Sequence, residues 1–300
     1  MSEREDKSKQ SMASAATGQD RKKFEMSDAK EYSCVKVEID DEGIAWVSFN
    51  RPEKRNAMSP ALHYEMEEVL PELETDPDVK VMVLTGEGVS WSAGMDLKEY
   101  FRETDNNPAA RFKSYWSHRH WAQYLMLSSK PTIAMVNGFC FGGAFTPLAA
   151  CDIAITAEEA TYGLSEINWG ILPGGNVSKV FSDLVSHRDA MFYAMTGRTF
   201  DGTKAVEMGI ANLAVPGDKL RDETIALARE LMEKSPAVLA FTKQAIKAVQ
   251  GMDMNLAYEY LQAKQGALRN ADKEGTRQKG MSEFLDNKSY RPGLGAVKRD

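Results

Sequence analysis

The amino-acid sequence predicts an α/β fold in which strands dominate the first part of the chain and helices the last part. Short apolar runs, each followed by a segment with helical spacing, indicate parallel strands joined by helical crossovers. From about residue 174 onward the apolar residues recur at helical spacing alone. With 300 residues, 43% of them hydrophobic and 27% charged, the chain is long enough for one large domain with a substantial core.

Several strands and one helix are predicted before residue 160. Cys34–Ile39 and Gly43–Phe49 alternate around an Asp-Asp-Glu-Gly turn, which predicts a pair of short strands. Pro60–Leu73 has apolar residues at helical spacing, and Asp76-Pro77 ends the predicted helix. Continuous apolar runs predict three buried strands, at Val79–Leu84, Ile133–Val136 and Cys151–Thr156.

The two ends of the chain differ in character. Residues 1–30 mix Lys and Arg with Asp and Glu and lack a hydrophobic segment, which predicts a disordered tail rather than a secretory signal or transit peptide. The C-terminal part is predicted to be helical, in segments near residues 174–184, 186–195, 203–208, 217–234, 236–250, 253–270 and 272–286.

Charge and composition exclude several classes of protein. The net charge of −7 and a pI near 5.4 argue against nucleic acid as the main partner. No apolar run reaches the roughly 18 residues that a membrane span needs. Cys34, Cys140 and Cys151 have no metal-like spacing, which favours reduced, mostly buried thiols in a cytoplasmic protein.

Two stretches carry the strongest chemical signal, and they place Thr146 and Glu166 twenty positions apart. Asn137–Thr146 (NGFCFGGAFT) indicates a tight glycine turn that opens a helix. Ala160–Gly170 (ATYGLSEINWG) places Glu166 in a mostly apolar loop, where burial would raise the pKa of its carboxyl towards neutrality. Taken alone, the glycines also suit an ordinary strand-to-helix turn, and Glu166 also suits a solvated loop.

Together with Ser92–Asp96 (SAGMD), these stretches resemble the signature segments of the crotonase (enoyl-CoA hydratase/isomerase) superfamily. The resemblance covers roughly Val35 to Gly293. It implies a spiral ββα core with the active site at residues 31–215. It also implies a helical region at 216–300 that completes the site and assembles a homotrimer or a dimer of trimers.

The resemblance implies an oxyanion hole and one acid–base residue. The backbone N–H groups of Met95 and Gly143 would bind the thioester oxygen as it becomes an enolate, and losing one such donor costs about 3 kcal/mol. Hydratases of the superfamily use two glutamates, but Thr146 occupies the first position here, so Glu166 alone remains. The Thr146 hydroxyl would hold a water molecule or help to seat Glu166, or else bond a preceding backbone carbonyl as in any helix.

Met95–Phe101 (MDLKEYF) brings the resemblance closer to the hydroxycinnamoyl-CoA hydratase-lyases, which typically carry serine at the position of Thr146. Tyr100 resembles the tyrosine that holds the phenolic oxygen of their substrate. An aromatic residue half-buried beside the cleft is the other interpretation. Gly142 and Trp169 are also assigned to the substrate.

A second phenol-binding tyrosine of those enzymes has no counterpart at its own position. It follows a Tyr-Leu pair in a late helix, where this chain has Gln262. Tyr258 lies four residues earlier on the same helical face and is the predicted substitute, reaching into the site of a neighbouring subunit.

Asn50–Ser59 (NRPEKRNAMS) resembles the coenzyme A loop of the superfamily, although three cations in a loop are more often solvated surface. In this interpretation the cations contact the phosphates of coenzyme A. The backbone carbonyls of a second segment, residues 92–94, contact its adenine. The residues assigned to coenzyme A are Arg51, Lys54, Arg55, Ser92, Ala93 and Gly94.

Other sites lack support in the sequence. His118 and His120 stand two positions apart, which suits neither one helix face nor a zinc site, and both are expected on the surface of a helix. No nucleotide-binding or serine-hydrolase string is present. The expected cofactor is therefore none beyond the coenzyme A of the substrate, with no metal.

The sequence thus predicts a lyase. It would hydrate a 4-hydroxycinnamoyl-CoA thioester such as feruloyl-, coumaroyl- or caffeoyl-CoA and cleave the product to an aromatic aldehyde of the vanillin type and acetyl-CoA. A hydratase or isomerase of the same fold acting on another acyl-CoA is the first alternative. A non-catalytic RNA-binding or scaffold protein of this fold is the second.

Overall fold

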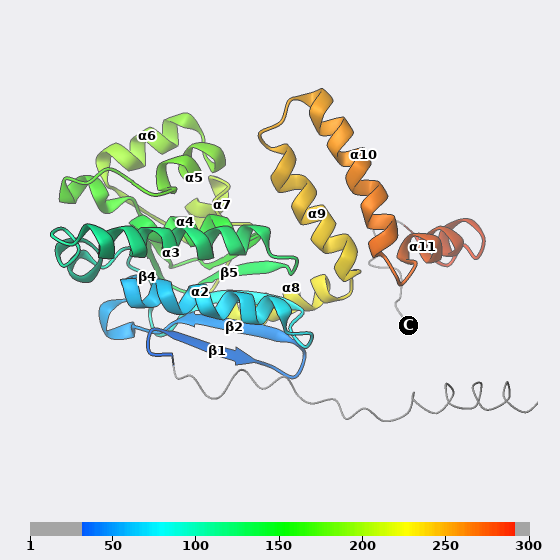
Figure 1. Cartoon of the computed structure of the whole chain (residues 1–300), viewed down its shortest axis with the longest axis horizontal. Coiled ribbons are helices and arrows are strands. Elements are labelled where there is room, and N and C mark those ends of the chain that lie inside the picture. Colours follow the sequence, from blue (N-terminus) through cyan, green and yellow to red (C-terminus); the bar gives the residue numbers. More distant parts are fainter. Residues whose placement is uncertain (1–31, 292–300) are drawn as a thin grey trace, which may run out of the picture. The chain divides into compact units, whose positions relative to one another are not determined.

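The computed structural model describes residues 32–291, beginning with two antiparallel strands (Figure 1). Strands β1 (Val35–Ile39) and β2 (Ile44–Phe49) pair along their whole lengths, as predicted. Asp40 closes the turn between them, because its carboxylate accepts hydrogen bonds from the backbone of Ile44 at 2.9 Å and the Trp46 ring at 3.1 Å. The tail predicted for residues 1–30 lies outside the described residues.

After β1 and β2, which both lie in the larger sheet, the core consists of successive strand pairs that contribute one strand to each of two sheets. The remaining strands are β3 (Val81–Gly86), β4 (Ser90–Ser92), β5 (Thr132–Val136), β6 (Phe139–Phe141), β7 (Ile153–Ala157), β8 (Thr161–Gly163), β9 (Thr199–Asp201) and β10 (Leu213–Val215). One sheet has the order β1-β2-β3-β5-β7-β10 and the other the order β4-β6-β8-β9. Within them, β2-β3-β5-β7-β10 and β4-β6-β8 are parallel. Each pair advances both sheets by one strand, which is the predicted spiral ββα core.

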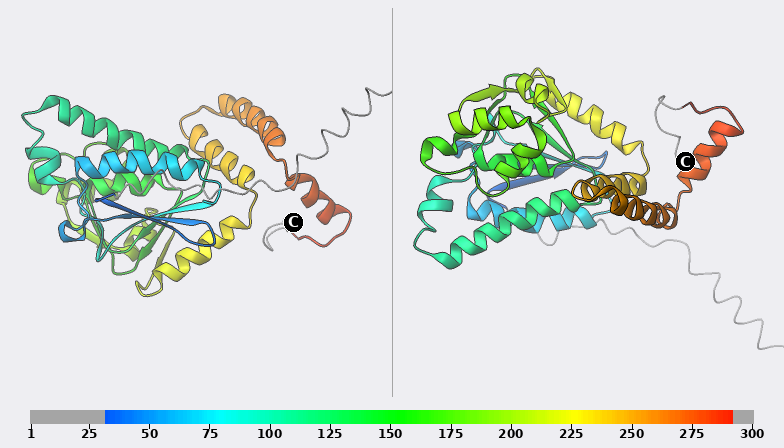
Figure 2. Two further views of the ribbon diagram at one scale, coloured as in Figure 1. Left: turned by 60° about the horizontal axis from the view of Figure 1, so that its bottom comes forward. Right: turned by 90° about the horizontal axis from the view of Figure 1, so that it is seen from above.

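Helices cover the sheets and carry the loops between the strand pairs. They are η1 (Pro52–Lys54), α2 (Pro60–Thr75), η2 (Leu97–Arg102), α3 (Pro108–Leu127), η3 (Gly142–Ala144), α4 (Phe145–Ala150), η4 (Ser165–Trp169), α5 (Val177–Leu184), α6 (His187–Thr196), α7 (Gly202–Glu207) and α8 (Leu220–Met232). Figure 2 shows α2 and α8 on opposite sides of the larger sheet. No bounds were predicted for α3, although Asn107 caps it by accepting from the Ala110 N–H at 3.1 Å.

The hydrophobic core joins the two sheets. Phe49 of β2 meets Trp91 of β4 edge-on, with ring centroids 5.5 Å apart, and Trp121 of α3 at 6.2 Å. All three rings are almost completely buried. Because aromatic rings bury the most apolar area per side chain, this cluster anchors α3 to both sheets.

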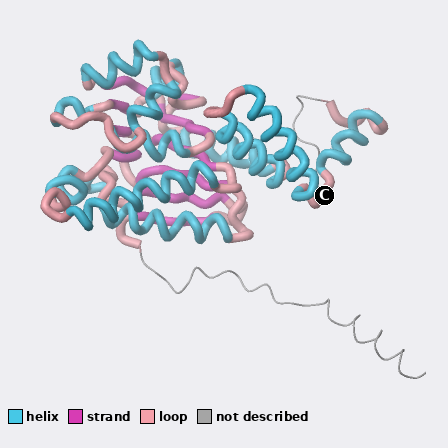
Figure 3. The backbone as a smooth tube through the Cα atoms, turned by 45° about the horizontal axis from the view of Figure 1, so that its top comes forward, coloured by secondary structure: helices cyan, strands magenta, loops and turns pink. Residues whose placement is uncertain are grey.

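The C-terminal helices attach to this core through buried and partly buried charges on the first of them. They are α9 (Pro236–Val249), α10 (Met254–Ala271) and α11 (Thr276–Leu285), and Figure 3 shows them beside the strand-bearing part of the chain. Lys243 and Lys247 of α9 pair with the Asp152 carboxylate at 2.8 and 2.6 Å. Neither α10 nor α11 buries a residue completely.

Candidate active site

A cavity of about 1070 Å³ opens between the two glycine-bearing segments of the core. Its lining comes from the loop after η1, from η2, from α3, and from the segments that carry η3 and η4. The lining residues predicted from the sequence are Lys54, Arg55, Ala93, Gly94, Met95, Tyr100, Gly142, Gly143, Thr146, Glu166 and Trp169. The structure therefore brings most of the predicted site together in one cavity.

The Met95 N–H is oriented by an isolated parallel bridge between Met95 and Met58. In this bridge Met58 donates to the Gly94 carbonyl at 2.7 Å and accepts from the Asp96 N–H at 3.0 Å. Both bonds use the neighbours of Met95, so its own N–H points away from Met58. It is thus available for another acceptor.

The second glycine segment lies directly against the first. Gly94 has φ +87°, and a β-carbon there would stand 2.5 Å from the Phe141 carbonyl oxygen and 3.2 Å from the Gly143 nitrogen. Gly143 lies in the first turn of η3, where backbone N–H groups have no partner within the helix. The N–H groups of Met95 and Gly143 therefore belong to adjoining segments, as an oxyanion hole requires.

The Glu166 carboxyl lies against the same glycine turn. Gly142 has φ +51°, and a β-carbon there would stand 3.1 Å from Glu166 Oε1. Glu166 Oε2 is buried and has no hydrogen-bond partner among the described side chains and backbone. Burial raises the pKa of this carboxyl, opposed in part by a hydrogen bond from its own backbone. These properties suit a group that takes up and returns a proton near neutral pH.

Thr146 of α4 contributes a second unpaired oxygen. Its side chain is 5% exposed, and its Oγ1 has no hydrogen-bond partner within the part of the chain that is described. Oγ1 lies 4.0 Å from where a β-carbon on Gly175 would stand, at the cavity lining. The bond to a preceding helical carbonyl, considered from the sequence, does not form. Thr146 is thus free to bond a water molecule or ligand in the cavity.

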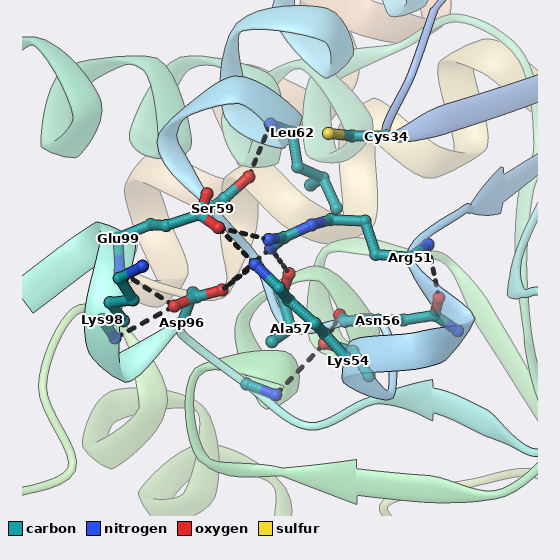
Figure 4. A network of polar contacts seen from close by, with 12 residues as sticks. Cys34, Arg51, Lys54, Asn56, Ala57, Ser59, Leu62, Asp96, Lys98 and Glu99 are labelled. Carbon is teal, nitrogen blue, oxygen red and sulfur yellow. Dashed lines mark hydrogen bonds and ion pairs between the residues drawn. The ribbon is translucent and has the colours of Figure 1, made fainter.

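Arg51 lies outside the cavity lining and in a buried network (Figure 4). Its guanidinium donates to the Ala57 carbonyl at 2.6 Å, to Asp96 Oδ2 at 3.1 Å and to Glu99 Oε1 at 2.7 Å. Asp96 Oδ1 in turn caps η2 by accepting from the N–H groups of Lys98 and Glu99. Arg51 therefore fixes the segment that bears Met95 and Tyr100, a placement different from the predicted phosphate contact.

The other residues predicted to bind coenzyme A divide into two groups. Lys54 and Arg55 line the cavity; Lys54 pairs with Glu99 at 2.5 Å, and the Arg55 guanidinium lies 5.2 Å from the centroid of the Phe139 ring. Ala93 and Gly94 also line it. Ser92 is fully buried away from the lining, where its Oγ donates to the Asn56 carbonyl at 2.8 Å and accepts from the Gly94 N–H.

The aromatic residues predicted to contact the substrate lie in different surroundings. Tyr100 of η2 lines the cavity and meets the His63 ring edge-on at 5.7 Å, and burial raises the pKa of its phenol. Trp169 ends η4 at the cavity, with 62% of its surface exposed. Tyr258 is 70% exposed on α10 and does not line the cavity of its own chain. Its predicted contact with a neighbouring subunit stays a prediction.

The wall formed by α3 was missed by the sequence analysis. It contributes Arg111, Phe112, Tyr115 and His118 to the cavity. The surface position expected for both histidines is confirmed for His120 and wrong for His118, which is 5% exposed. The buried residues of α3 recur at three- and four-residue spacing, at Ser114, Ser117, His118, Trp121, Ala122 and Leu125. This periodicity was the available signal that His118 faces inward.

Among residues 32–291, no group of three or more His, Cys, Asp or Glu side chains is placed to hold a metal ion. No helix within that range is long and apolar enough to cross a membrane. Cys34, Cys140 and Cys151 are free and buried, as predicted.

The ββα spiral, the paired glycine segments and Glu166 define a member of the enoyl-CoA hydratase/isomerase family, whose sequence pattern matches residues 40–291. The chain belongs to that family. It is 55% identical over 271 residues to the hydroxycinnamoyl-CoA hydratase-lyase of Pseudomonas fluorescens, covering 89% of this chain and 98% of that protein.

More distant relatives align with this chain over nearly their whole length. A putative enoyl-CoA hydratase of Thermus thermophilus is 30% identical, with 85% of this chain and 99% of that protein aligned. The crystal structure of an enoyl-CoA hydratase from Bacillus anthracis superposes with a TM-score of 0.77 at 26% identity, covering 85% and 96% of the two chains. The resemblance identified from the motifs is thereby confirmed.

Proposed function

We propose that this chain is a lyase that hydrates a 4-hydroxycinnamoyl-CoA thioester and then cleaves it to an aromatic aldehyde and acetyl-CoA. The observation that carries the proposal is the single available carboxylate of the cavity. Among the described residues, Asp96 and Glu166 are the acids that line it, and both Asp96 oxygens are already bonded. The 55% identity to a hydroxycinnamoyl-CoA hydratase-lyase supports the aromatic substrate.

In the hydration step, ionised Glu166 removes a proton from a water molecule, whose oxygen adds to the β-carbon of the enoyl thioester. Electrons pass through the α-carbon to the thioester oxygen, where the N–H groups of Met95 and Gly143 hold the developing enolate. Glu166 then returns the proton to the α-carbon, and Thr146 positions the water through its unpaired hydroxyl.

In the cleavage step, the same carboxylate removes the proton of the new β-hydroxyl. The bond between the α- and β-carbons breaks, and the β-carbon leaves as the carbonyl carbon of the aldehyde. The electron pair of the broken bond stays with the α-carbon and forms the enolate of acetyl-CoA. Glu166 protonates this enolate and is ionised again. One carboxylate serves both steps because each step leaves it in the state that the next one needs.

Several finer assignments belong to this proposal. Tyr100 contacts the para-oxygen of the ring, and Trp169 and Gly142 border the rest of the acyl group. Lys54 and Arg55 at the cavity contact the phosphates of coenzyme A, and the Ala93 and Gly94 backbone contacts its adenine. The Arg51 guanidinium supports this site indirectly, because it bonds acceptors of the protein, whereas the Ser92 backbone carbonyl belongs with those of Ala93 and Gly94 at the adenine.

We propose a homo-oligomer, a trimer or a dimer of trimers, in the cytoplasm. Apolar side chains exposed on α10 and α11 support assembly, since an isolated chain leaves them in water. They are Met254, Leu256, Leu261, Met281, Phe284 and Leu285. Free buried thiols are consistent with a reducing compartment.

The test is to incubate the purified chain with feruloyl-CoA and quantify the thioester, vanillin and acetyl-CoA. Equal amounts of vanillin and acetyl-CoA are expected as the thioester disappears. A hydrated thioester without aldehyde would instead establish a hydratase. Unchanged feruloyl-CoA would reject the aromatic substrate, and crotonyl-CoA would then be the next probe.

A further inference from the structure

His118 is a buried polar residue of the cavity that the proposed catalytic steps do not use. It lies on the inner face of α3 and lines the same cavity as Glu166 and Tyr100. More than nine tenths of its surface is buried, yet its Nε2 has no hydrogen-bond partner within the described part of the chain. Leaving a buried polar group unpaired costs about 1–3 kcal/mol, so a position of this kind calls for an explanation.

The imidazole of His118 is held in place by ring contacts. It stacks on His63 with centroids 4.7 Å apart and 28° between the planes. His63 is itself fixed, because its Nδ1 accepts from Trp121 Nε1 at 3.1 Å and its ring meets Tyr100 edge-on at 5.7 Å. Through His63, the orientation of His118 is thus tied to the tyrosine predicted to hold the substrate phenol.

His118 is electrically neutral at physiological pH, since burial lowers its pKa to about 4. Arg111, Phe112 and Tyr115 of the same helix also line the cavity. Arg111 lowers and Tyr115 raises the pKa of Tyr100, although burial has the largest effect on it. This end of the cavity therefore combines aromatic walls with two hydroxyls, one cation and one neutral imidazole, a composition suited to an oxygenated aromatic ring.

We propose that His118 hydrogen-bonds an oxygen substituent on the aromatic ring of the substrate and so selects oxygenated rings over unsubstituted ones. Nε2 of a neutral imidazole donates or accepts according to its tautomer, so phenolic hydroxyl and methoxy oxygens both suit it. The inference rests on the proposed aromatic substrate. It adds a polar contact from within the same chain to the one expected of Tyr100.

The test measures binding rather than turnover, in a Glu166→Gln background that does not consume the ligand. Dissociation constants are determined for cinnamoyl-, coumaroyl- and caffeoyl-CoA. His118→Phe retains a ring to stack on His63 but removes Nε2. It is expected to weaken binding of the oxygenated thioesters about tenfold while leaving cinnamoyl-CoA within about twofold.

Two amide variants form a matched pair that tests the proposal even if the phenylalanine variant does not fold. The His118→Gln amide reaches roughly the position of Nε2, whereas the His118→Asn amide reaches that of Nδ1. Glutamine is expected to restore most of the affinity for coumaroyl- or caffeoyl-CoA, and asparagine is not. A loss on caffeoyl-CoA alone assigns the meta oxygen, and a loss on both assigns the para oxygen.

Equal weakening of all three thioesters, or no weakening of any, would overturn the proposal. So would equal affinities of the glutamine and asparagine variants. Turnover of feruloyl-CoA by the unmodified chain is measured in parallel. If that turnover is absent while the ring-dependent affinity change persists, the proposed reaction fails and the role of His118 stands.

Discussion

The polar groups at two walls of the cavity differ in whether they have hydrogen-bond partners within the protein. One wall, formed by η2 and supported from behind by Arg51, is the closed wall: the Arg51 guanidinium has three acceptors, and both Asp96 oxygens are bonded. The other wall, formed by η3, α4 and η4, is the open wall: Glu166 Oε2 and Thr146 Oγ1 are buried there without a hydrogen-bond partner among the described residues. The closed wall holds the Met95 N–H in position, while the open wall carries the Gly143 N–H and keeps side-chain oxygens free for chemistry.

The difference follows from what each wall must do. A backbone donor stabilises an enolate only if it is fixed before the charge develops, so the supporting polar groups are satisfied internally. A proton-transferring carboxyl needs a raised pKa, which burial provides and which paired cations would abolish. We therefore expect substitutions at the closed wall to reduce stability and substitutions on the open wall to reduce activity.

The largest expected effect is on the open wall. Glu166→Gln keeps the shape of the side chain but removes the only available carboxylate among those described in the cavity. Turnover of feruloyl-CoA should fall by about 10²–10⁴-fold, the usual contribution of general acid–base catalysis. Steady-state kinetics with product quantification measures the loss.

The same variant separates catalysis from folding. Because Glu166 Oε2 has no partner to lose, the melting temperature of Glu166→Gln should equal or exceed that of the unmodified chain. Retention of full activity would remove Glu166 from the mechanism. A large drop in melting temperature would contradict the contrast between the walls.

The next effect is on the closed wall and appears in stability. Arg51→Leu removes the cation that neutralises Asp96, and both side chains are only 8% exposed. Stranding one partner of a buried ion pair typically lowers the free energy of unfolding by about 3–5 kcal/mol. Urea denaturation followed by circular dichroism is the measurement.

A matched control lies in the same network. Lys54 also pairs with Glu99, but its side chain is 45% exposed. Lys54→Met should therefore lower the free energy of unfolding much less than Arg51→Leu does, because an exposed ion pair contributes little. If the two variants destabilised the chain equally, the buried position of Arg51 would not be the cause.

The sequence alone predicted the open wall better than the closed one. Thr146 belongs to the stretch that carries the glycine turn, and Glu166 belongs to a second short stretch, so each was found from a local pattern. The contact between Glu166 and Gly142 joins the two separate segments. The partners of Arg51 lie 45 and 48 positions further along the chain, and nothing local shows that they enclose its guanidinium. The neighbouring residues in the sequence do not distinguish a buried arginine from a solvated one.

The fold shows the same division between local and distant information. The main strands and C-terminal helices were predicted within a few residues, because each has its own periodicity. The three-residue strands β4, β6, β8 and β9, which form the smaller sheet, are too short for a period-two pattern to stand out. His118 was misplaced because it was compared with His120 rather than with Trp121.

A smaller effect is expected from the second oxygen of the open wall. Thr146→Val preserves the shape but removes the hydroxyl, so turnover of feruloyl-CoA should fall about tenfold, as for the loss of one hydrogen bond. Stability should not fall, because that hydroxyl is unpaired in the chain. Thr146→Ser, which keeps the hydroxyl, is the control. Equal kinetics for the valine and serine variants would show that the hydroxyl takes no part.

The smallest expected effect is the difference between Glu166 and Asp96 in how each carboxyl changes the stability of the fold with pH. Burial raises the pKa of Glu166 above its ordinary 4.5, so its folded form binds the proton more tightly than its unfolded form. The resulting penalty is absent below the unfolded pKa and fully present above the folded pKa. For Asp96, burial acts in the raising direction, but the N–H groups of Glu99 and Lys98 and the Arg51 guanidinium outweigh it and hold the pKa below 3.8.

The two carboxyls should therefore give stability differences of opposite sign. Relative to the unmodified chain, Glu166→Gln should gain stability as pH rises through the raised pKa of Glu166. Asp96→Asn should be less stable at neutral pH, and its deficit should shrink as pH falls through the lowered pKa of Asp96, where the native carboxylate loses its charge. Urea titrations between about pH 3 and 7 measure both trends. The acid limb of turnover should follow the Glu166 pKa and lie above pH 4.5. If both variants changed stability in the same direction with pH, the two walls would not differ in how they hold their charges.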